Sequence, residues 1–214
     1  METMGPQDQR HPDTAHRRFV PTGAVFLSVA VLGSAALQFS FPQLIGSDGF
    51  FHLRMAERVL GGEMPWMPGS IFDEGWVDHQ LLFHGAMAPF AWLFEGVVAA
   101  KLAAATFAAV AAFALWHFLR EERCPNPAFF ALLPFGLSWL FWLRMEMPRT
   151  QSLSLALLVA SITALSKGRH RMLFVLAWIY AWTYHVALIL LPVSLLHAIV
   201  ISQLPRGGWR RFRW

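Results

Sequence analysis

The sequence predicts an all-α, polytopic membrane protein. We expect a helix bundle with about six transmembrane spans, plus an interfacial amphipathic helix and a re-entrant segment in a large first outer loop. Hydrophobic residues make up 56% of the 214 residues and charged residues only 14%, whereas soluble domains carry about 25% charged residues. Long apolar runs recur along most of the chain, which is typical of proteins that cross a membrane several times.

The apolar segments give the number of spans. They cover residues 19–44, 81–94, 97–119, 127–143, 151–166 and 172–203. Segment 81–94 is short, and a run of about 10–14 apolar residues more often re-enters or lies at the interface than crosses. Segment 172–203 would form about 48 Å of helix, which is too long for one pass through a core of about 30 Å. We therefore expect it to cross twice, with a turn near Thr183, Tyr184 and His185.

The distribution of Lys and Arg predicts the orientation. If 81–94 does not cross and 172–203 crosses twice, 12 of the 17 basic residues are cytoplasmic and both termini lie inside. If 81–94 also crosses, only six of the 17 are inside. In a third topology, 81–94 crosses the membrane and 172–203 crosses it only once, as a single long helix. This topology places ten of the 17 basic residues inside and remains an alternative. The positive-inside rule favours the first arrangement.

Three regions follow from this arrangement. Residues 1–18 are polar and form a disordered cytoplasmic lead, residues 19–204 form the transmembrane module, and residues 205–214 form a basic cytoplasmic tail. The outer loop 45–80 carries a net charge of −4. The single Cys124 excludes an internal disulfide. Because no basic-aromatic stripe or nucleic-acid motif is present, we expect no nucleic-acid partner.

Asp48 is the first candidate for chemistry, because it follows the first apolar segment directly in Gly46-Ser47-Asp48-Gly49. Residues 50–60 then mix apolar and charged side chains in the pattern of an interfacial amphipathic helix. A carboxylate at the mouth of a membrane span predicts an active site at the outer surface. The alternative is that Ser47 and Asp48 only cap the helix that follows.

The second candidate lies where the chain returns toward the membrane, at Trp76, Asp78 and His79. Asp78 and His79 have the side chains of a general base or of ligands for a divalent cation. The alternative is that Asp78 caps a helix and His79 is hydrated. We expect His84 and His117, which lie within apolar segments, to be packed or hydrogen-bonded rather than ligands.

The third candidate is the short outer connection that contains Arg144, Glu146, Arg149 and Gln151. It places two arginines on the outer side, whereas most Lys and Arg residues of this chain lie on the cytoplasmic side in the favoured arrangement. A guanidinium there is suited to binding a phosphate or diphosphate group. The alternative is that both arginines extend to lipid phosphates. His185 lies beside an aromatic cluster near the proposed outer turn, where such clusters usually form an interfacial belt.

The arrangement resembles the GT-C superfamily of integral-membrane glycosyltransferases, and within it the oligosaccharyltransferase catalytic subunits and bacterial lipid-linked sugar transferases. In that superfamily a first span leads to a large outer loop that opens with an acidic residue, as Asp48 does here. Bacterial relatives often carry an Asp-aromatic-His run and then a Trp-Val-x-His run, which Asp48, His52, Trp76 and His79 match. Residues 148–151 are a permuted counterpart of an Arg-Pro-Gln-like segment.

The resemblance implies transfer of a sugar from a polyprenyl-phosphate donor on the outer side of the membrane. Asp48 would be the catalytic carboxylate, and Arg149 would face the donor phosphate. The further residues implied are His52, Asp78 and His79 for catalysis, and Arg144, Gln151, Trp76 and His185 for substrate binding. A divalent cation, Mg²⁺ or Mn²⁺, would be held by Asp48 and Glu146. The location implied is the plasma (inner) membrane of a bacterium, with the site facing the periplasm or exterior.

The chain departs from the family at two points. Oligosaccharyltransferases have paired acidic residues in the second outer loop, where this chain has only Glu146 beside two arginines. Family members also continue with more spans, so this chain is expected to be the N-terminal module of a split or truncated enzyme. It would then be inactive alone, and a second chain could complete it. The alternative function is a non-catalytic transporter or scaffold subunit that binds lipid-linked sugars.

Overall fold

The computed structural model describes residues 22–63 and 78–203, and all the regular structure in these ranges is helical. The elements are α1 (Gly23–Phe39), α2 (Asp48–Leu60), α3 (Leu81–Leu93), α4 (Gly96–Glu121), α5 (Pro127–Leu137), α6 (Trp139–Glu146), α7 (Thr150–Ser166), α8 (His170–Thr183), η1 (His185–Ile189) and α9 (Leu190–Gln203). The predicted all-α class is therefore confirmed for the part of the chain that is described.

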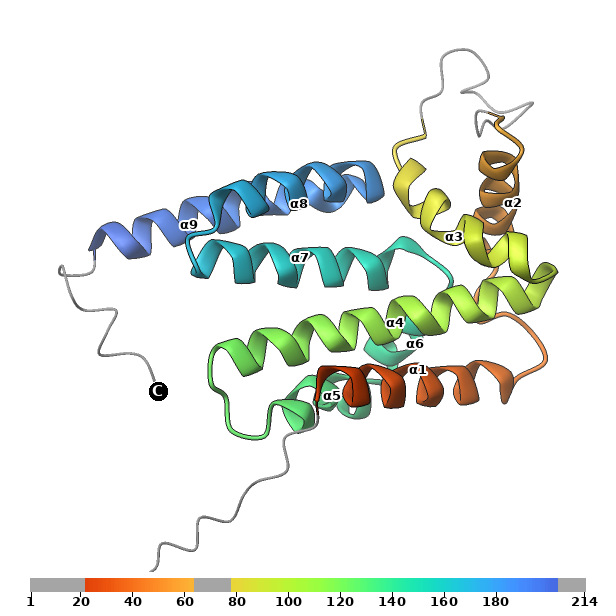
Figure 1. Cartoon of the computed structure of the whole chain (residues 1–214), viewed down its shortest axis with the longest axis horizontal. Coiled ribbons are helices and arrows are strands. Elements are labelled where there is room, and N and C mark those ends of the chain that lie inside the picture. Colours follow the sequence, from red (N-terminus) through yellow and green to blue (C-terminus); the bar gives the residue numbers. More distant parts are fainter. Residues whose placement is uncertain (1–21, 64–77, 204–214) are drawn as a thin grey trace, which may run out of the picture.

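Helix α4 is the centre of the bundle. It packs along α1 on one side and along α7 on the other, and α8 covers α7 (Figure 1). Its alanines are buried, with Ala99, Ala103 and Ala111 fully inaccessible. Small side chains on one helix let neighbouring helices approach closely. The Ala-rich run of α4 therefore provides the surface on which the other long helices pack.

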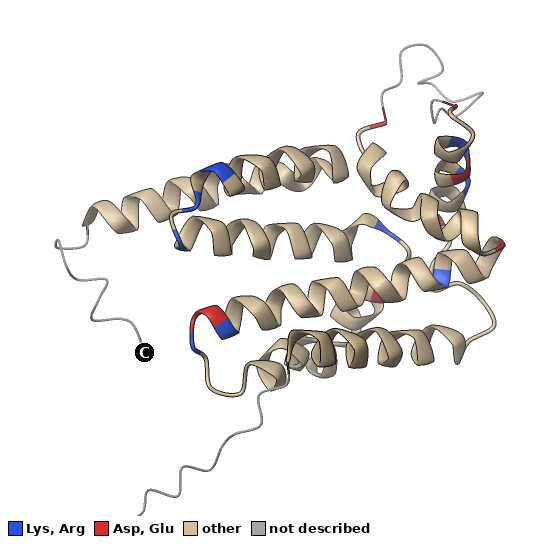
Figure 2. Ribbon diagram, in the orientation of Figure 1, with Lys and Arg blue, Asp and Glu red and all other residues tan. Residues whose placement is uncertain are grey.

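The molecule has two ends, which the chain visits alternately (Figure 1). The end of α1, helices α2 and α3, and the starts of α4 and α7 share one of them, which we name the α2–α3 end. The end of α4 and the turn between α7 and α8 lie at the opposite end, which we name the α7–α8 end. Figure 2 shows that most charged residues lie at these two ends and few along the long helices. The fold therefore places polar groups where a bilayer would leave them in contact with water.

Helix α2 is amphipathic and covers residues 50–60, where the sequence predicts an amphipathic helix. Its buried face carries His52, Leu53 and Ala56, while Phe50 and Arg54 are exposed. The helix ends at a glycine pair, in which Gly62 has a φ of +70° that favours glycine. Helix α3 packs against α2 and α4 at the α2–α3 end. Its 13 residues extend for only about 20 Å.

The predicted number of six spans is not supported by the helix lengths. Among the described residues, two helical stretches are long and apolar enough to cross a membrane, Gly96–Glu121 and His185–Gln203. The pair α5 and α6 makes a third if a bent pair is one span. Helices α1 and α7 have 17 residues each, or about 26 Å of helix against a core of about 30 Å.

Residues 127–143, which the sequence gives as one apolar segment, do not form one continuous helix. Helices α5 and α6 are bent by 98° at Ser138. Ser138 has an extended backbone, and its hydroxyl accepts the N–H of Phe141 at 3.2 Å, so it caps a new helix. The break expected in 172–203 does occur, because α8 ends at Thr183 and Tyr184 is extended. The chain then turns back through η1 and α9 (Figure 1).

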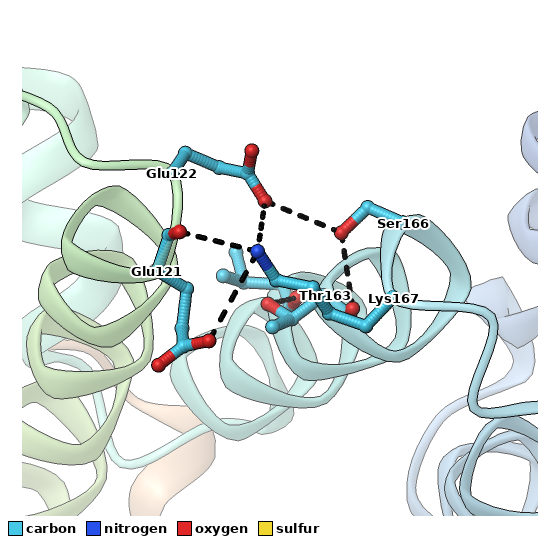
Figure 3. Close-up of polar contacts among 6 residues, drawn as sticks. Glu121, Glu122, Thr163, Ser166 and Lys167 are labelled. Atoms are coloured by element: carbon cyan, nitrogen blue, oxygen red, sulfur yellow. Dashed lines mark hydrogen bonds and ion pairs between the residues drawn. The ribbon is translucent and has the colours of Figure 1, made fainter. Parts of the chain in front are cut away.

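A polar clamp joins α4 to α7 at the α7–α8 end (Figure 3). The Lys167 ammonium forms an ion pair with Glu122 at 3.0 Å and donates to the backbone carbonyl of Glu121 at 3.1 Å. The Ser166 hydroxyl donates to the same Glu122 carboxylate at 3.4 Å. The clamp fixes the C-terminal ends of the two central helices relative to each other.

Candidate functional site

An ion pair between Asp48 and Arg149 lies at the α2–α3 end. Asp48 is in the first turn of α2, and Arg149 directly precedes α7. Both side chains are accessible, at 48% for Asp48 and 30% for Arg149. A carboxylate in the first turn of a helix also interacts favourably with the helix dipole. The pair therefore provides an exposed anion and cation at a fixed place, brought together from segments about 100 residues apart.

Glycines allow this approach. A Cβ atom on Gly49 would lie 2.3 Å from Cγ of Pro148, which is buried. Gly46 has a φ of +86°, in the left-handed region that favours glycine. A Cβ atom there would be 3.4 Å from the Met147 side chain. The connector before α2 thus packs directly on residues 147–148, which brings Asp48 next to Arg149.

A buried chain of hydrogen bonds joins the start of α3 to α2. The Asp78 carboxylate lies 2.5 Å from Nδ1 of His84, and Nε2 of His84 lies 3.0 Å from Nδ1 of His52. All three residues are buried, at 4%, 1% and 6% exposed respectively. Since an ionised carboxylate only accepts, Nδ1 of His84 carries the proton of the first bond. In the second bond one imidazole nitrogen donates its proton and the other accepts it.

Burial is the main reason that the pKa of His52 is lowered from 6.5 to about 4, and the neighbouring His84 lowers it further. The charges of Asp48, Arg149 and Asp78 also act on His52, with the two carboxylates raising its pKa and the guanidinium lowering it. His52 is therefore a neutral imidazole near neutral pH. It lies one turn after Asp48 on α2, so the histidine chain and the ion pair belong to one site.

The structure thus brings together Asp48, His52, Asp78 and Arg149, which the sequence proposed as separate candidates. Asp78 also accepts the backbone N–H of Gln80 at 2.9 Å in the turn before α3, but Gln80 and not Asp78 is the N-cap of that helix. Asp78 can make both contacts at once, because Oδ1 accepts the N–H of Gln80 and Oδ2 bonds to Nδ1 of His84.

His79 and His185 form a second contact nearby. Their rings lie 5.6 Å apart, edge to face, and both residues are exposed. His185 begins η1, directly after the turn that ends α8. The prediction that these two residues share one side of the molecule agrees with this contact, which joins the turn before α3 to the turn after α8.

Glu146 lies in a different environment from the one expected. It is the last residue of α6 and is 3% exposed, whereas the sequence suggested an outer loop. The Ser34 hydroxyl donates to its carboxylate at 2.6 and 2.7 Å, and the Gln38 amide donates to it at 3.0 Å. The two proposed cation ligands therefore have different partners, since Asp48 pairs with Arg149. Within residues 22–63 and 78–203 there is no group of three or more His, Cys, Asp or Glu that could hold a metal.

The remaining predicted residues are placed less distinctly. Arg144 is exposed on α6. Gln151, in the first turn of α7, has a buried Oε1 without a hydrogen-bond partner in the described structure. Trp76 lies outside the described residues.

His84 is the residue of the site that the sequence did not predict as functional, since it was expected only to pack or form hydrogen bonds. It does form hydrogen bonds, but to two candidate residues, His52 and Asp78. The sequence does contain a signal for this contact, because His84 follows Asp78 by six residues. At that spacing an acidic side chain just before a helix can reach a histidine in its first turns.

No protein-family model, curated protein or solved structure matches this chain. The fold and the geometry of the site therefore carry the functional argument.

Proposed function

We propose that this chain is a membrane glycosyltransferase of the GT-C type, or the N-terminal half of one. It transfers a sugar from a polyprenyl-phosphate donor to an acceptor on the outer side of the membrane. The observation that carries the proposal is the accessible Asp48–Arg149 pair next to a neutral, buried His52 at the α2–α3 end. A proton acceptor and a phosphate-binding cation at one membrane boundary are the two groups that such a transfer needs.

Asp48 acts on the acceptor in this proposal. The acceptor hydroxyl attacks C1 of the donor sugar and gives its proton to the Asp48 carboxylate as the new C1–O bond forms. The bond between C1 and the phosphate oxygen breaks, and polyprenyl phosphate leaves with the electron pair. Asp48 is suited to this role because it is about half exposed and begins a helix. General-base assistance of this kind contributes about 10²–10⁴-fold in rate.

Arg149 acts on the leaving group. Its guanidinium offers five N–H donors in a fixed plane, which matches phosphate oxygens in pairs. One carboxylate cannot satisfy all five, and Nε of Arg149 is buried without a hydrogen-bond partner in the described structure. A phosphate bound there would have its developing charge stabilised by a cation already in position.

The chain Asp78–His84–His52 positions the site in this proposal. It joins the turn before α3 to the buried face of α2, and so fixes the helix that carries Asp48. A divalent cation does not fit the described residues well, because Glu146 is occupied by α1 and Asp48 by Arg149.

The proposal includes the orientation predicted from the sequence. Both termini are cytoplasmic, and the α2–α3 end faces the periplasm or exterior of a plasma membrane. The path of the chain supports this, since α1, α4, α5 with α6, α7, α8 and α9 carry it from one end to the other (Figure 1). Six crossings are proposed, of which the described helix lengths support two, or three if α5 and α6 form one bent span. A second chain is proposed to complete the enzyme.

Binding of farnesyl phosphate to the full chain in detergent tests the donor side, with tryptophan fluorescence as the readout. Arg149→Gln should weaken binding about tenfold or more, because it removes a charge-assisted contact worth about 1.5–3 kcal/mol. Arg54→Gln is the matched control, since Arg54 is also paired with a carboxylate, Glu57, on the same helix as Asp48. Equal affinity in the wild type and Arg149→Gln would overturn the assignment of Arg149.

A further inference from the structure

A second site lies at the α7–α8 end, away from the Asp48–Arg149 pair. A groove of about 340 Å³ runs between α4 and α7 and reaches the start of α8. Its lining is apolar along most of its length, as at Val110, Ala156 and Ala160. The polar residues of the groove are His117 near the end of α4, Thr163 near the end of α7 and Arg169 in the turn before α8. The groove is therefore apolar along the helices and basic at one end.

The basic end continues into a second hollow. This hollow is lined by residues 168–172 and shares Arg169 and Met172 with the groove. Arg169, His170 and Arg171 are consecutive and exposed. No described carboxylate forms an ion pair with either arginine, and the nearby Glu121 and Glu122 are already engaged by Lys167 (Figure 3). The cationic groups at this mouth are therefore available to an anion from outside the chain.

The charges of Arg169 and Arg171 are electrostatically unfavourable at the start of α8 when no ligand is bound. The N-terminal end of a helix carries a partial positive charge, and cations there are unfavourable. Helix α8 has no acidic residue in its first turn. Arg169 and Arg171 therefore lie beside a like charge with no described carboxylate to offset it. An anionic group at the mouth of the groove would relieve this repulsion.

We propose that the groove binds an anionic glycerophospholipid from the bilayer. One acyl chain lies along the apolar lining between α4 and α7, and the phosphate lies beside Arg169 and His117. The apolar groove explains why the ligand is a lipid, and the basic mouth explains why it is an anionic one. A lipid here would hold the turn between α7 and α8 next to the Lys167 clamp. This site does not depend on the function proposed above.

The test measures thermal unfolding of the full chain in an uncharged detergent while lipid is added. Phosphatidylglycerol should raise the midpoint, and phosphatidylcholine with the same acyl chains should not. Arg169→Gln should weaken the apparent affinity for phosphatidylglycerol about fivefold, as expected for one basic residue at an anionic lipid surface. Ala160→Phe should abolish the shift by filling the groove. Arg54→Gln, at the other end of the molecule, should leave it unchanged.

Three results would overturn the proposal. Equal shifts with both lipids would show that the headgroup is not recognised. A shift with inorganic phosphate or glycerol phosphate as large as that with phosphatidylglycerol would show that no acyl chain is bound. An unchanged affinity in Arg169→Gln would exclude the basic mouth, and this variant should fold because Arg169 is exposed. Asp48→Asn should bind the lipid normally, so failure of the transferase proposal would leave this result intact.

Discussion

Gly49 and Pro148 approach so closely that a Cβ atom on residue 49 would lie 2.3 Å from Cγ of the proline ring. Each is the neighbour in sequence of one member of the ion pair, Asp48 or Arg149. The proline is buried, and its ring cannot turn away as a flexible side chain would. The distance between the two charged groups is therefore set by backbone packing as well as by their attraction.

Gly49→Ala should separate α2 from residues 147–149. Overpacking of this kind costs about 1–3 kcal/mol, so the midpoint of thermal unfolding in detergent should fall by several degrees. Gly85→Ala is the control, since a Cβ atom on Gly85, in the neighbouring α3, would meet nothing within 4 Å. It should be neutral or slightly stabilising, because alanine favours helix more than glycine does. Equal midpoints for the two variants would show that the Pro148 contact is not tight.

Ser34→Ala should destabilise the chain by about 1–3 kcal/mol, because it removes a hydrogen bond to the buried Glu146 carboxyl group. The Ser34 hydroxyl is the nearest donor to the Glu146 carboxylate, and the Gln38 amide donates to the same carboxylate and to the Glu146 carbonyl. Ser40→Ala is the matched control, since Ser40 directly follows α1 and its exposed hydroxyl donates to the carbonyl of Leu37. The measurement is denaturation in mixed micelles. In a double-mutant cycle, Ser34→Ala and Glu146→Gln should not be additive.

The lowered pKa of His52 predicts that stability falls in mild acid. The folded-state value of about 4 lies below the ordinary value of 6.5, so between these pH values the unfolded chain binds a proton that the folded chain does not. The stability from this group is complete above pH 6.5 and is lost as the pH falls toward 4. The loss is at most about 3 kcal/mol. Unfolding midpoints across this range should show it, and His52→Gln should flatten the slope. If stability falls equally steeply with pH in the wild type and in His52→Gln, His52 is not the group responsible.

Cys124 reports the orientation directly. It follows α4 at the α7–α8 end and is partly exposed. In intact spheroplasts an impermeant maleimide should not label it until the membrane is permeabilised. Glu95→Cys in a Cys124→Ser background should label from outside, because Glu95 is exposed just before α4 at the α2–α3 end. The opposite pattern would place the Asp48–Arg149 pair in the cytoplasm and exclude an outer active site.

Local patterns predicted much of the helical fold. The apolar and charged alternation over residues 50–60 predicts α2, and the polar and aromatic residues near Thr183 predict the break between α8 and η1. The size of the bend at Ser138 was not predicted, because Pro134 in this apolar run indicates only an ordinary helix kink. A serine that caps a new helix within such a run has no hydropathy signal. The lengths of the apolar segments likewise overestimated the lengths of the helices that they form.

The sequence selects the candidate residues but not the contacts between them. Asp48, His52, Asp78 and Arg149 were identified from position and motif, but their contacts depend on tertiary packing that hydropathy does not encode. The burial of Glu146 was missed because its partners, Ser34 and Gln38, lie more than 100 residues earlier in α1. His84 was underestimated for a related reason, since its importance depends on two bonds that only the packing of α3 against α2 creates.

Turnover of a polyprenyl-phosphate sugar by the full chain, with its proposed partner chain if one is encoded beside it, tests the central claim most directly. Release of polyprenyl phosphate is measured for the wild type, Asp48→Asn and Glu57→Gln. Glu57 is the control because it is an exposed carboxylate on the same helix, paired with Arg54. The account predicts release by the wild type and Glu57→Gln and a loss of about 10²-fold or more in Asp48→Asn. Release that is equal in all three proteins, or donor binding without any release, would contradict a catalytic role for Asp48.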